Sequence, residues 1–366
     1  MKNRSSHVRL QGYSTRSLAF SLTGALVAFA SLGVACSGGG AGSGSGGATG
    51  TGSGGATGTG SGGSSGGGTA PYKPCGDDKR TGGFTLDLKR ADEATMNAAY
   101  SQVAGGVSDG VRPSDVWVPE TVAGAGSECR LMVGPMNVCT PACNTMQVCK
   151  GTTCQTAPVR KSVGEVNFTG LVIPVKMTPM MTSTGVVYGG LIPSSTMYPP
   201  YTVGAALGLT AAGADYPMFS LSGTGIQPLE PMAGQTLNVA KDQPLTIKWQ
   251  TAAANGQGRI AVVMDIAHHG GVSAEIQCEV ADTGSVTIPA ALINALMAKG
   301  TFGFPTVSLT RMSVDSATVG PGCVEFKVAA GVELSLNVAG VVSCNDDSGC
   351  TPPQKCLTPG YKCAAP

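Results

Sequence analysis

The stretch Leu245-Thr246-Ile247-Lys248-Trp249-Gln250 decides the fold, because apolar and polar side chains alternate along it. A period of two is that of a β-strand with one buried face, so the pattern predicts that Trp249 lies in a core. Other short apolar or β-branched segments, separated by Gly, Pro, Asn or Asp, are also expected to be strands. These are Phe84 to Leu88, Val163 to Val175, Arg259 to Ile266, Ala274 to Val280, Thr306 to Met312 and Val324 to Val328. Their regular spacing is typical of an all-β, immunoglobulin-like β-sandwich.

One segment is predicted to be a short helix. Pro289 is a favourable first residue, and Gly300 is placed to end the helix. The residues that share its apolar face are Leu292, Leu296 and Met297. The stretch from Ala91 to Ser101 fits either a weak helix or an irregular edge strand.

Residues 1–35 have the layout of an export signal. A basic segment without acidic residues precedes the uncharged, mostly apolar stretch from Ser17 to Ala35. The end of that stretch, Leu32-Gly33-Val34-Ala35-Cys36, resembles the lipobox that the lipoprotein signal peptidase cuts. It departs from the usual pattern in having Gly33 three residues before the Cys, where that pattern has Leu. Lipid attachment at Cys36 is therefore the main expectation, with an uncleaved membrane anchor or unlipidated secretion as alternatives.

A flexible tether is expected over residues 36–70. From Ser37 to Ala70 only Gly, Ser, Thr and Ala occur, and one octapeptide is repeated in tandem from Gly44 to Thr59. A segment with no apolar side chains to bury cannot offset its ordering entropy, so it should remain disordered. The rest of the chain is predicted to contain a small β-rich region (71–138), a Cys-rich module (139–154), a β-sandwich domain (155–340) and a C-terminal Cys-rich module (341–366).

Removing Cys36 from the 13 Cys leaves twelve, an even number in a chain that we expect to be exported. Six disulfides are the simplest inference, because exported proteins fold under oxidising conditions. One cluster consists of Cys139, Cys143, Cys149 and Cys154, and the other of Cys344, Cys350, Cys356 and Cys363. Four Cys permit three pairings, and in each cluster we favour first-to-third with second-to-fourth pairing, because it cross-braces so short a loop. Cys278 is expected to pair with Cys323 and, by elimination, Cys75 with Cys129.

Metal and cofactor sites are not predicted. Structural zinc sites favour C-x2-C knuckles, and the sequence contains none. Met177, Met180 and Met181 could bind Cu(I), because soft thioethers suit a soft ion, although Met also fills irregular cores. The adjacent Asp346 and Asp347 offer too few oxygens for calcium and are more typical of a solvated turn.

Candidate catalytic residues are few. His268 and His269 follow an apolar strand, with Asp265 nearby as an orienting carboxylate in an enzyme reading. A nucleophile would have to be Ser108 in Gly106-Val107-Ser108-Asp109-Gly110, but that motif has a turn-like setting and not the strand-to-helix setting of a nucleophile elbow. No catalysis is therefore predicted, and an exported hydrolase using His268 and His269 is kept as an alternative.

The exported part resembles the cysteine-rich, sandwich-containing surface lipoproteins of some Gram-negative soil bacteria. The resemblance rests on the Gly/Ser tether after Cys36, the module from Cys139 to Cys149, and the stretch from Ile276 to Gly284 that leads into Pro289. It implies architecture and supplies no catalytic residue. Ser37 after the lipid Cys resembles lipoproteins sent to the outer membrane.

The expected function is a structural or surface-binding role in the bacterial cell envelope. The membrane is one partner, through the lipid anchor, and the other is an unidentified extracellular or periplasmic ligand, either a carbohydrate or a protein. Trp117 is a core residue or a sugar-stacking platform. The formal net charge of +1, without a basic patch, disfavours a nucleic-acid partner.

Overall fold

The computed structural model describes residues 70–91, 98–135, 137–183, 185–192, 198–267, 273–358 and 360–365. All of these belong to one compact unit, residues 63–366. The predicted leader, Cys36 and the tether up to Thr69 lie outside the described residues, as do His268 and His269. No helix among the described residues is long and apolar enough to cross a membrane.

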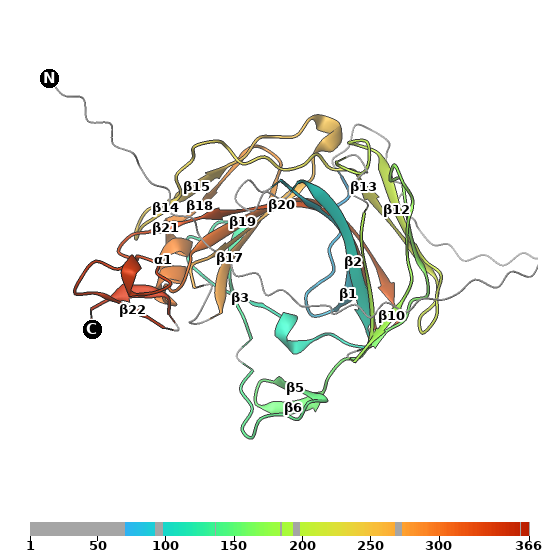
Figure 1. Ribbon diagram of the computed structural model, residues 1–366, viewed down its shortest axis with the longest axis horizontal. Coiled ribbons are helices and arrows are strands. Elements are labelled where there is room, and N and C mark those ends of the chain that lie inside the picture. Colours follow the sequence, from blue (N-terminus) through green and yellow to red (C-terminus); the bar gives the residue numbers. More distant parts are fainter. Residues whose placement is uncertain are drawn as a thin grey trace, which may run out of the picture. The chain divides into compact units, whose positions relative to one another are not determined.

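An eleven-stranded, strongly curved sheet is the largest element of the fold (Figure 1). Neighbouring strands are antiparallel except for the pairs β1–β20 and β7–β11, which are parallel. Its centre is a hairpin of two 14-residue strands, β19 and β20, joined by a tight turn at Gly320. In spatial order the strands are β10 (Met180–Thr182), β11 (Gly185–Leu191), β7 (Arg160–Lys161), β2 (Tyr100–Ser108), β1 (Arg80–Lys89), β20 (Gly322–Ser335), β19 (Thr306–Val319), β16 (Arg259–Asp265), β17 (Ala274–Ala281), β4 (Cys129–Val133) and β3 (Val118–Glu120).

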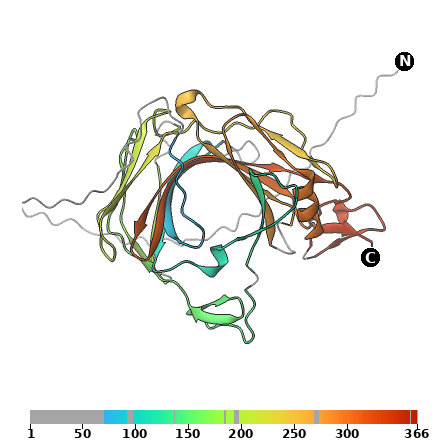
Figure 2. The ribbon, with the colours of Figure 1, turned by 180° about the vertical axis from the view of Figure 1, so that it is seen from behind.

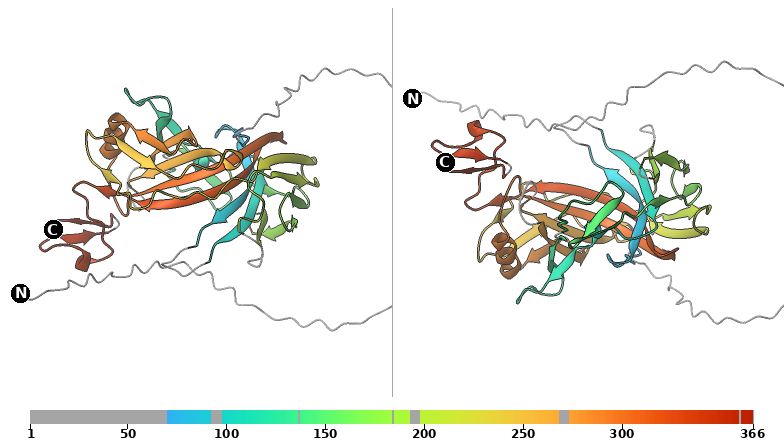
Figure 3. Two further views of the ribbon diagram at one scale, coloured as in Figure 1. Left: turned by 90° about the horizontal axis from the view of Figure 1, so that it is seen from above. Right: turned by 90° about the horizontal axis from the view of Figure 1, so that it is seen from below.

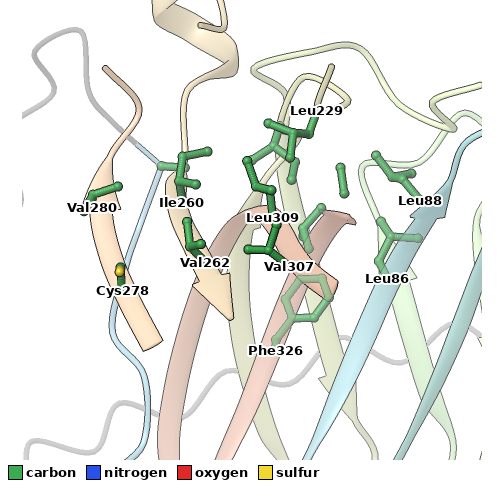
Figure 4. Packing of buried hydrophobic residues seen from close by; sticks show 14 of the residues in the cluster. Leu86, Leu88, Leu229, Ile260, Val262, Cys278, Val280, Val307, Leu309 and Phe326 are labelled. Atoms are coloured by element: carbon green, nitrogen blue, oxygen red, sulfur yellow. The ribbon is translucent and has the colours of Figure 1, made fainter. Parts of the chain in front are cut away.

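Side chains alternate between two faces of this sheet, because successive residues of a strand point in opposite directions. On β16, Ile260, Val262 and Met264 are fully buried, whereas the residues between them are only partly covered. The buried face continues across neighbouring strands through Leu309 and Phe326, as Figure 4 shows. One face of the sheet therefore forms the core, and we call the other the polar face.

A four-stranded sheet covers part of the core face and makes the fold a two-layer sandwich. Its strands are β13 (Phe219–Thr224), β12 (Ala206–Ala211), β8 (Val166–Thr169) and β9 (Val175–Met177). The rings of Phe168 and Phe326 meet edge to face across the layers, with centroids 5.6 Å apart. At Gly223 an added Cβ would lie 3.0 Å from the Phe326 ring, so a small residue there lets the layers approach.

A helix and small two-stranded sheets cover the rest. These are α1 (Ala290–Ala298), β14 (Asn238–Val239) with β21 (Asn337–Val338), β15 (Leu245–Lys248) with β18 (Ser285–Ile288), β5 (Gln147–Lys150) with β6 (Thr153–Thr156), β22 (Lys355–Leu357) with β23 (Lys362–Ala364), and the 3-10 turns η1 (Pro113–Asp115), η2 (Ala254–Gly256) and η3 (Asp347–Gly349). The predicted helix is confirmed: Pro289 precedes it, its buried face includes Leu292 and Leu296, and Gly300 follows it with φ +108°.

The predicted all-β sandwich with one short helix in its described part is confirmed. The eleven-stranded sheet is wider than the seven to nine strands of immunoglobulin domains. Residues 71–138, expected as a small β-rich region, contribute β1 to β4 to that same sheet. The predicted strand from Val163 to Val175 is broken between β8 and β9, where Gly170 adopts φ +83°. Of the undecided stretch Ala91 to Ser101, the last two residues begin β2, and residues 92–97 lie outside the described part.

Trp249 is buried in the core, as its alternating pattern predicts, and it belongs to a buried polar network. Its Nε1 donates to Asp282 Oδ1 at 2.8 Å, and Arg311 Nε donates to Asp282 Oδ2 at 2.8 Å. The Arg311 guanidinium also donates to the carbonyl oxygens of Gln227, Pro228 and Gln250. Both charged side chains are at most 1% exposed. A buried ion pair is tolerated only when its hydrogen bonds are satisfied, as they are here.

All twelve cysteines after Cys36 form disulfides, and the predicted pairing within each cluster is confirmed. The bridges are Cys139–Cys149, Cys143–Cys154, Cys344–Cys356 and Cys350–Cys363. The third and fourth Cys of each cluster lie directly opposite each other on a hairpin, β5–β6 in one and β22–β23 in the other. The two modules thus repeat one arrangement, and Figures 2 and 3 show the C-terminal module at the end of the body away from the four-stranded sheet.

The predicted long-range pairs are wrong: Cys75 bonds Cys323, and Cys129 bonds Cys278. Cys129 and Cys278 are cross-strand neighbours on β4 and β17, with Cα atoms 4.1 Å apart. Three strand spacings separate Cys278 on β17 from Cys323 on β20, roughly 14 Å, which is about twice the reach of a disulfide. Elimination failed because it ignored which strands become neighbours.

Replacing Cys75 and Cys323 together by Ala should lower the free energy of unfolding by about 4 kcal/mol. The bridge joins residues 248 positions apart, so its loss releases a long loop in the unfolded chain. Urea unfolding followed by far-UV circular dichroism measures the change.

The matched control is the double replacement Cys143→Ala and Cys154→Ala, which opens an 11-residue separation inside a module. It should change global unfolding by less than about 1 kcal/mol, because it does not touch the large sheet. An equal loss of unfolding free energy in the two double variants would contradict the expectation that the long-range bridge stabilises the fold more than the bridge within the module.

Arg311→Met should cost about 3 to 5 kcal/mol of folding free energy, because it leaves Asp282 charged and buried without its partner. Adding Asp282→Asn should recover part of that loss, since the amide oxygen can still accept from Trp249 without a net charge. Urea unfolding with disulfides intact measures both.

Lys327→Met, on the polar face of the neighbouring strand, serves as control and should stay within about 0.5 kcal/mol of wild type. If Arg311→Met were equally mild, the buried pair would not be a structural requirement.

Candidate binding face

The polar face of the eleven-stranded sheet is the candidate functional surface. Its side chains come from the positions that alternate with the core, such as Gln277 and Glu279 on β17 and Lys327 on β20. The four-stranded sheet and α1 lie against the opposite face, so the polar face lines the concave side of the curved sheet in Figure 1. Two hollows lie on it, and they share Arg80.

The first hollow, about 240 Å³ in volume, lies over β16, β17, β19 and β20, and we call it the tyrosine hollow. Its polar lining is Tyr72, Arg80, Gln277, Glu279, Thr310, Glu325 and Lys327. Opposite charges thus sit side by side, with Arg80 and Glu325 3.7 Å apart. This mixed lining can donate and accept hydrogen bonds to a neutral polar ligand.

The backbone on either side of Tyr72 holds this residue in the tyrosine hollow. The flanking residues pair with Val314 on β19, through Lys73 N to Val314 O and Val314 N to Pro71 O, each 2.8 Å. The guanidinium of Arg259 lies 5.5 Å from the centre of the Tyr72 ring. Burial, together with a hydrogen bond to the carboxylate of Glu279, raises the pKa of the Tyr72 hydroxyl well above its usual range. Tyr72 therefore remains a neutral hydrogen-bonding group.

The second hollow, about 450 Å³ in volume, lies over β1, β2 and the ends of β7 and β11, and we call it the arginine hollow. Its floor is nearly free of side chains, because Gly83 and Gly106 are direct partners across β1 and β2. Neighbouring Gly105 faces the core, where an added Cβ would lie 2.3 Å from the Phe84 ring. That ring packs edge to face on Tyr188, and it stabilises this glycine-rich part of the sheet.

Three arginines line the arginine hollow: Arg80, Arg112 and Arg160. Arg80 is held by Asp77 at 3.0 Å and by Glu325. With the residues that the structure describes, neither Arg112 nor Arg160 forms an ion pair. The hollow consequently offers guanidinium donors that the protein itself does not neutralise.

The candidate catalytic residues Ser108 and Asp265 form hydrogen bonds with neighbouring parts of the fold. Ser108 is buried as the last residue of β2, and its carbonyl oxygen accepts from the Tyr216 hydroxyl. A bend and the loop before η1 follow it, so the motif is not a strand-to-helix elbow. Asp265 Oδ1 accepts from the backbone N–H of Ala267 at 2.7 Å. His268 and His269 lie outside the described residues.

The methionines of the copper reading lie in different settings. Met177, on β9, is 3% exposed and belongs to the core, where it fills space. Met180 and Met181, on β10, are 47% and 80% exposed, and as successive residues of a strand they point to opposite faces. Trp117 is partly buried between η1 and β3, and it lines neither hollow.

The cysteine clusters bring sulfur atoms together without offering thiolates. The sulfurs of Cys139, Cys143 and Cys149 lie within 4.8 Å of one another because they belong to two disulfides. In the C-terminal module, Asp346 accepts from the backbone and hydroxyl of Ser348, and Asp347 accepts from Cys356 N. The hydrogen bonds from Ser348 lower the pKa of Asp346. Both carboxylates thus act within turns of the module.

The arginine hollow was missed from the sequence. Its three arginines stand 32 and 48 residues apart and follow no motif spacing. Register alone brings them together, since Ser108 on β2 pairs with Arg160 on β7. A usable signal was the pair of glycine doublets, Gly82-Gly83 and Gly105-Gly106, inside segments that become strands. Glycine within a strand often marks a close approach of a backbone or a ligand.

Comparisons with known proteins add little. No protein-family description matches the chain, and no curated protein matches it. Among solved structures, the chain is similar to the FN1–FN3 domains of chicken CNTN1, with 7% sequence identity, 63% of this chain and 69% of the other covered, and a TM-score of 0.18. At that TM-score the likeness does not carry an argument about this protein.

Glu275 on β17 gives the polar face a pH-dependent contribution to stability. Partial burial is the main cause of its raised pKa, and the nearby charge of Asp265 adds to it, although a hydrogen bond from Gln277 opposes the shift. A carboxyl group with a raised pKa favours folding while it is protonated, and this contribution is lost as pH rises through the folded-state value. Above the pH range in which Glu275 titrates, its carboxylate is therefore less favourable to the fold than a neutral side chain at this position.

Glu275→Gln should raise the free energy of unfolding at pH 7, and the gain should vanish below about pH 4, where unfolded glutamates are also protonated. Urea unfolding at a series of pH values measures the difference from wild type. Glu333→Gln, an exposed position on β20, is the matched control and should show no such trend. A Glu275→Gln variant less stable than wild type at pH 7 would contradict the assignment.

Proposed function

We propose that the protein is a lipid-anchored component of the bacterial cell envelope that binds a surface ligand, without catalysis, through the polar face of its eleven-stranded sheet. The observation that carries the proposal is the pair of hollows on that face. Both are concave and present polar and charged side chains, and together they extend over most strands of the sheet. Ligand sites are typically concave with a few convergent polar groups.

The disulfides support an exported location. Six bridges occur in one chain, and such bonds persist only where the compartment is oxidising. The sequence before residue 70 supports anchoring: an export signal, then a lipobox-like end at Cys36, then a Gly/Ser/Thr/Ala tether. Acyl chains contribute about 0.8 kcal/mol per buried CH2, so several chains on Cys36 would hold the protein permanently. Ser37 after the Cys favours the outer membrane as the destination.

The setting of Ser108 supports a binding role over hydrolysis. Ser108 is buried as the last residue of β2. A nucleophile must be exposed to reach its substrate, and the Ser108 side chain is not. The resemblance to cysteine-rich surface lipoproteins points in the same direction.

Replacing residues 1–36 by a cleavable export signal without a lipobox should move the protein from the membrane pellet to the soluble fraction, because both the apolar leader and the acylated residue are lost. Intact-mass spectrometry of the wild type should show a chain that begins at acylated Cys36. On an array of envelope glycans and proteins, the released variant should bind the same ligands as the detergent-extracted wild type, since the polar face is unchanged.

Ser37→Ala is the matched control and should stay in the pellet with its acyl mass. A wild-type mass that includes the intact leader would replace the lipid anchor by an uncleaved membrane anchor. An array without any bound glycan or protein would overturn the binding role.

A further inference from the structure

The floor of the arginine hollow contains a glycine that the fold does not require. At Gly106 an added Cβ would lie 3.8 Å from Val186 O and 3.9 Å from Arg160 Cδ, which are ordinary contacts, and Gly106 is not among the glycines with positive φ. A glycine inside a strand weakens it, and a β-branched residue would be the better choice. The missing side chain instead keeps the hollow open above the sheet. Neither backbone conformation nor packing explains the glycine at position 106, and access of a ligand to the floor of the hollow does.

The side chains around this floor define the chemistry of a ligand. Arg112 and Arg160 converge on the hollow, and neither has a carboxylate partner among the described residues. The nearby Asp109 is already engaged, by Lys161 at 3.4 Å and by the backbone of Val159. A planar guanidinium pairs best with a planar oxyanion such as a carboxylate, which it can bind through two parallel hydrogen bonds.

The volume of the arginine hollow and its other lining residues limit the class of ligand that fits. A hollow of about 450 Å³ exceeds the volume of a bare anion and suits one or two sugar rings. Asp115 also lines it, and its carboxylate can accept hydrogen bonds from hydroxyl groups. The Asp115 carboxylate would repel a doubly charged phosphate more than a singly charged carboxylate.

We propose that the arginine hollow binds the carboxylate of a uronic-acid unit in an acidic polysaccharide. The inference rests on the proposed binding function and names its ligand class. The sugar ring lies on the side-chain-free floor at Gly83 and Gly106, and the carboxylate pairs with Arg112 and Arg160. Because the attraction is electrostatic and partly exposed, added salt weakens it.

Isothermal titration calorimetry on the full-length protein in detergent tests this, with a short oligogalacturonate as probe and a neutral galactan oligomer of equal length as comparison. The oligogalacturonate should bind, and the neutral oligomer should bind at least about tenfold more weakly. Replacing Arg112 and Arg160 together by Gln should weaken oligogalacturonate binding by about tenfold or more. Gly106→Val should block binding while keeping or raising stability, because Val fills the floor and favours the strand.

Arg130→Gln is the matched control, because Arg130 lies on β4 beside Glu279 and outside the arginine hollow. Its binding should equal that of wild type. Equal binding of the neutral oligomer, equal competition by inorganic phosphate, or indifference to the Arg112 and Arg160 replacement would each overturn the inference. The proposed function would survive those results if ligands on the array still bound, and it would fall only if none did.

Discussion

The buried ion pair between Arg311 and Asp282 is the constraint on which the rest of the body depends. It ties β19 to the turn after β17, and its remaining donors tie both to the loop at Gln227 and to the residue after Trp249. A shift of β19 by one residue would turn Arg311 to the polar face and leave Asp282 in the core without its partner. The register of the sheet, and with it the identity of every side chain on the polar face, is thereby fixed.

The polar face is a direct consequence of the same alternation. Each central strand uses every second residue for the core, so the residues between them must face the concave side. The tyrosine hollow arises where those residues are long and charged, and the arginine hollow arises where they are glycine and alanine. Contrast in side-chain size between neighbouring strands shapes this surface, together with the loop that carries Arg112 and the segment that carries Tyr72.

Much of the fold could be predicted from local pattern. The alternation around Trp249, the boundaries at Pro289 and Gly300, and the crossed pairing in each cysteine cluster all follow from residues close in sequence. Cys75 and Cys129 were paired incorrectly because their partners depend on strand order, which local pattern does not encode. The arginine hollow escaped prediction for the same reason, since β2, β7 and the loop at Arg112 meet only through the sheet. Arg311, a charged residue at a core position, gave no sign in sequence of the carboxylate that accommodates it.

The bridge from Cys75 to Cys323 also determines how the body responds to mechanical tension. The segment just before Cys75 is where the polypeptide enters the sheet, and Cys75 N donates to Glu325 on β20 beside the disulfide. A force on that segment is transmitted through the disulfide to the central hairpin of β19 and β20, so it does not separate β1 and β2 from the neighbouring strands. The 248-residue separation that the bridge spans corresponds to roughly 800 Å of extended chain. While the disulfide is intact, the chain between Cys75 and Cys323 cannot be extended by a force applied before Cys75. Shear or drag that acts through this segment would therefore have to disrupt another part of the fold first.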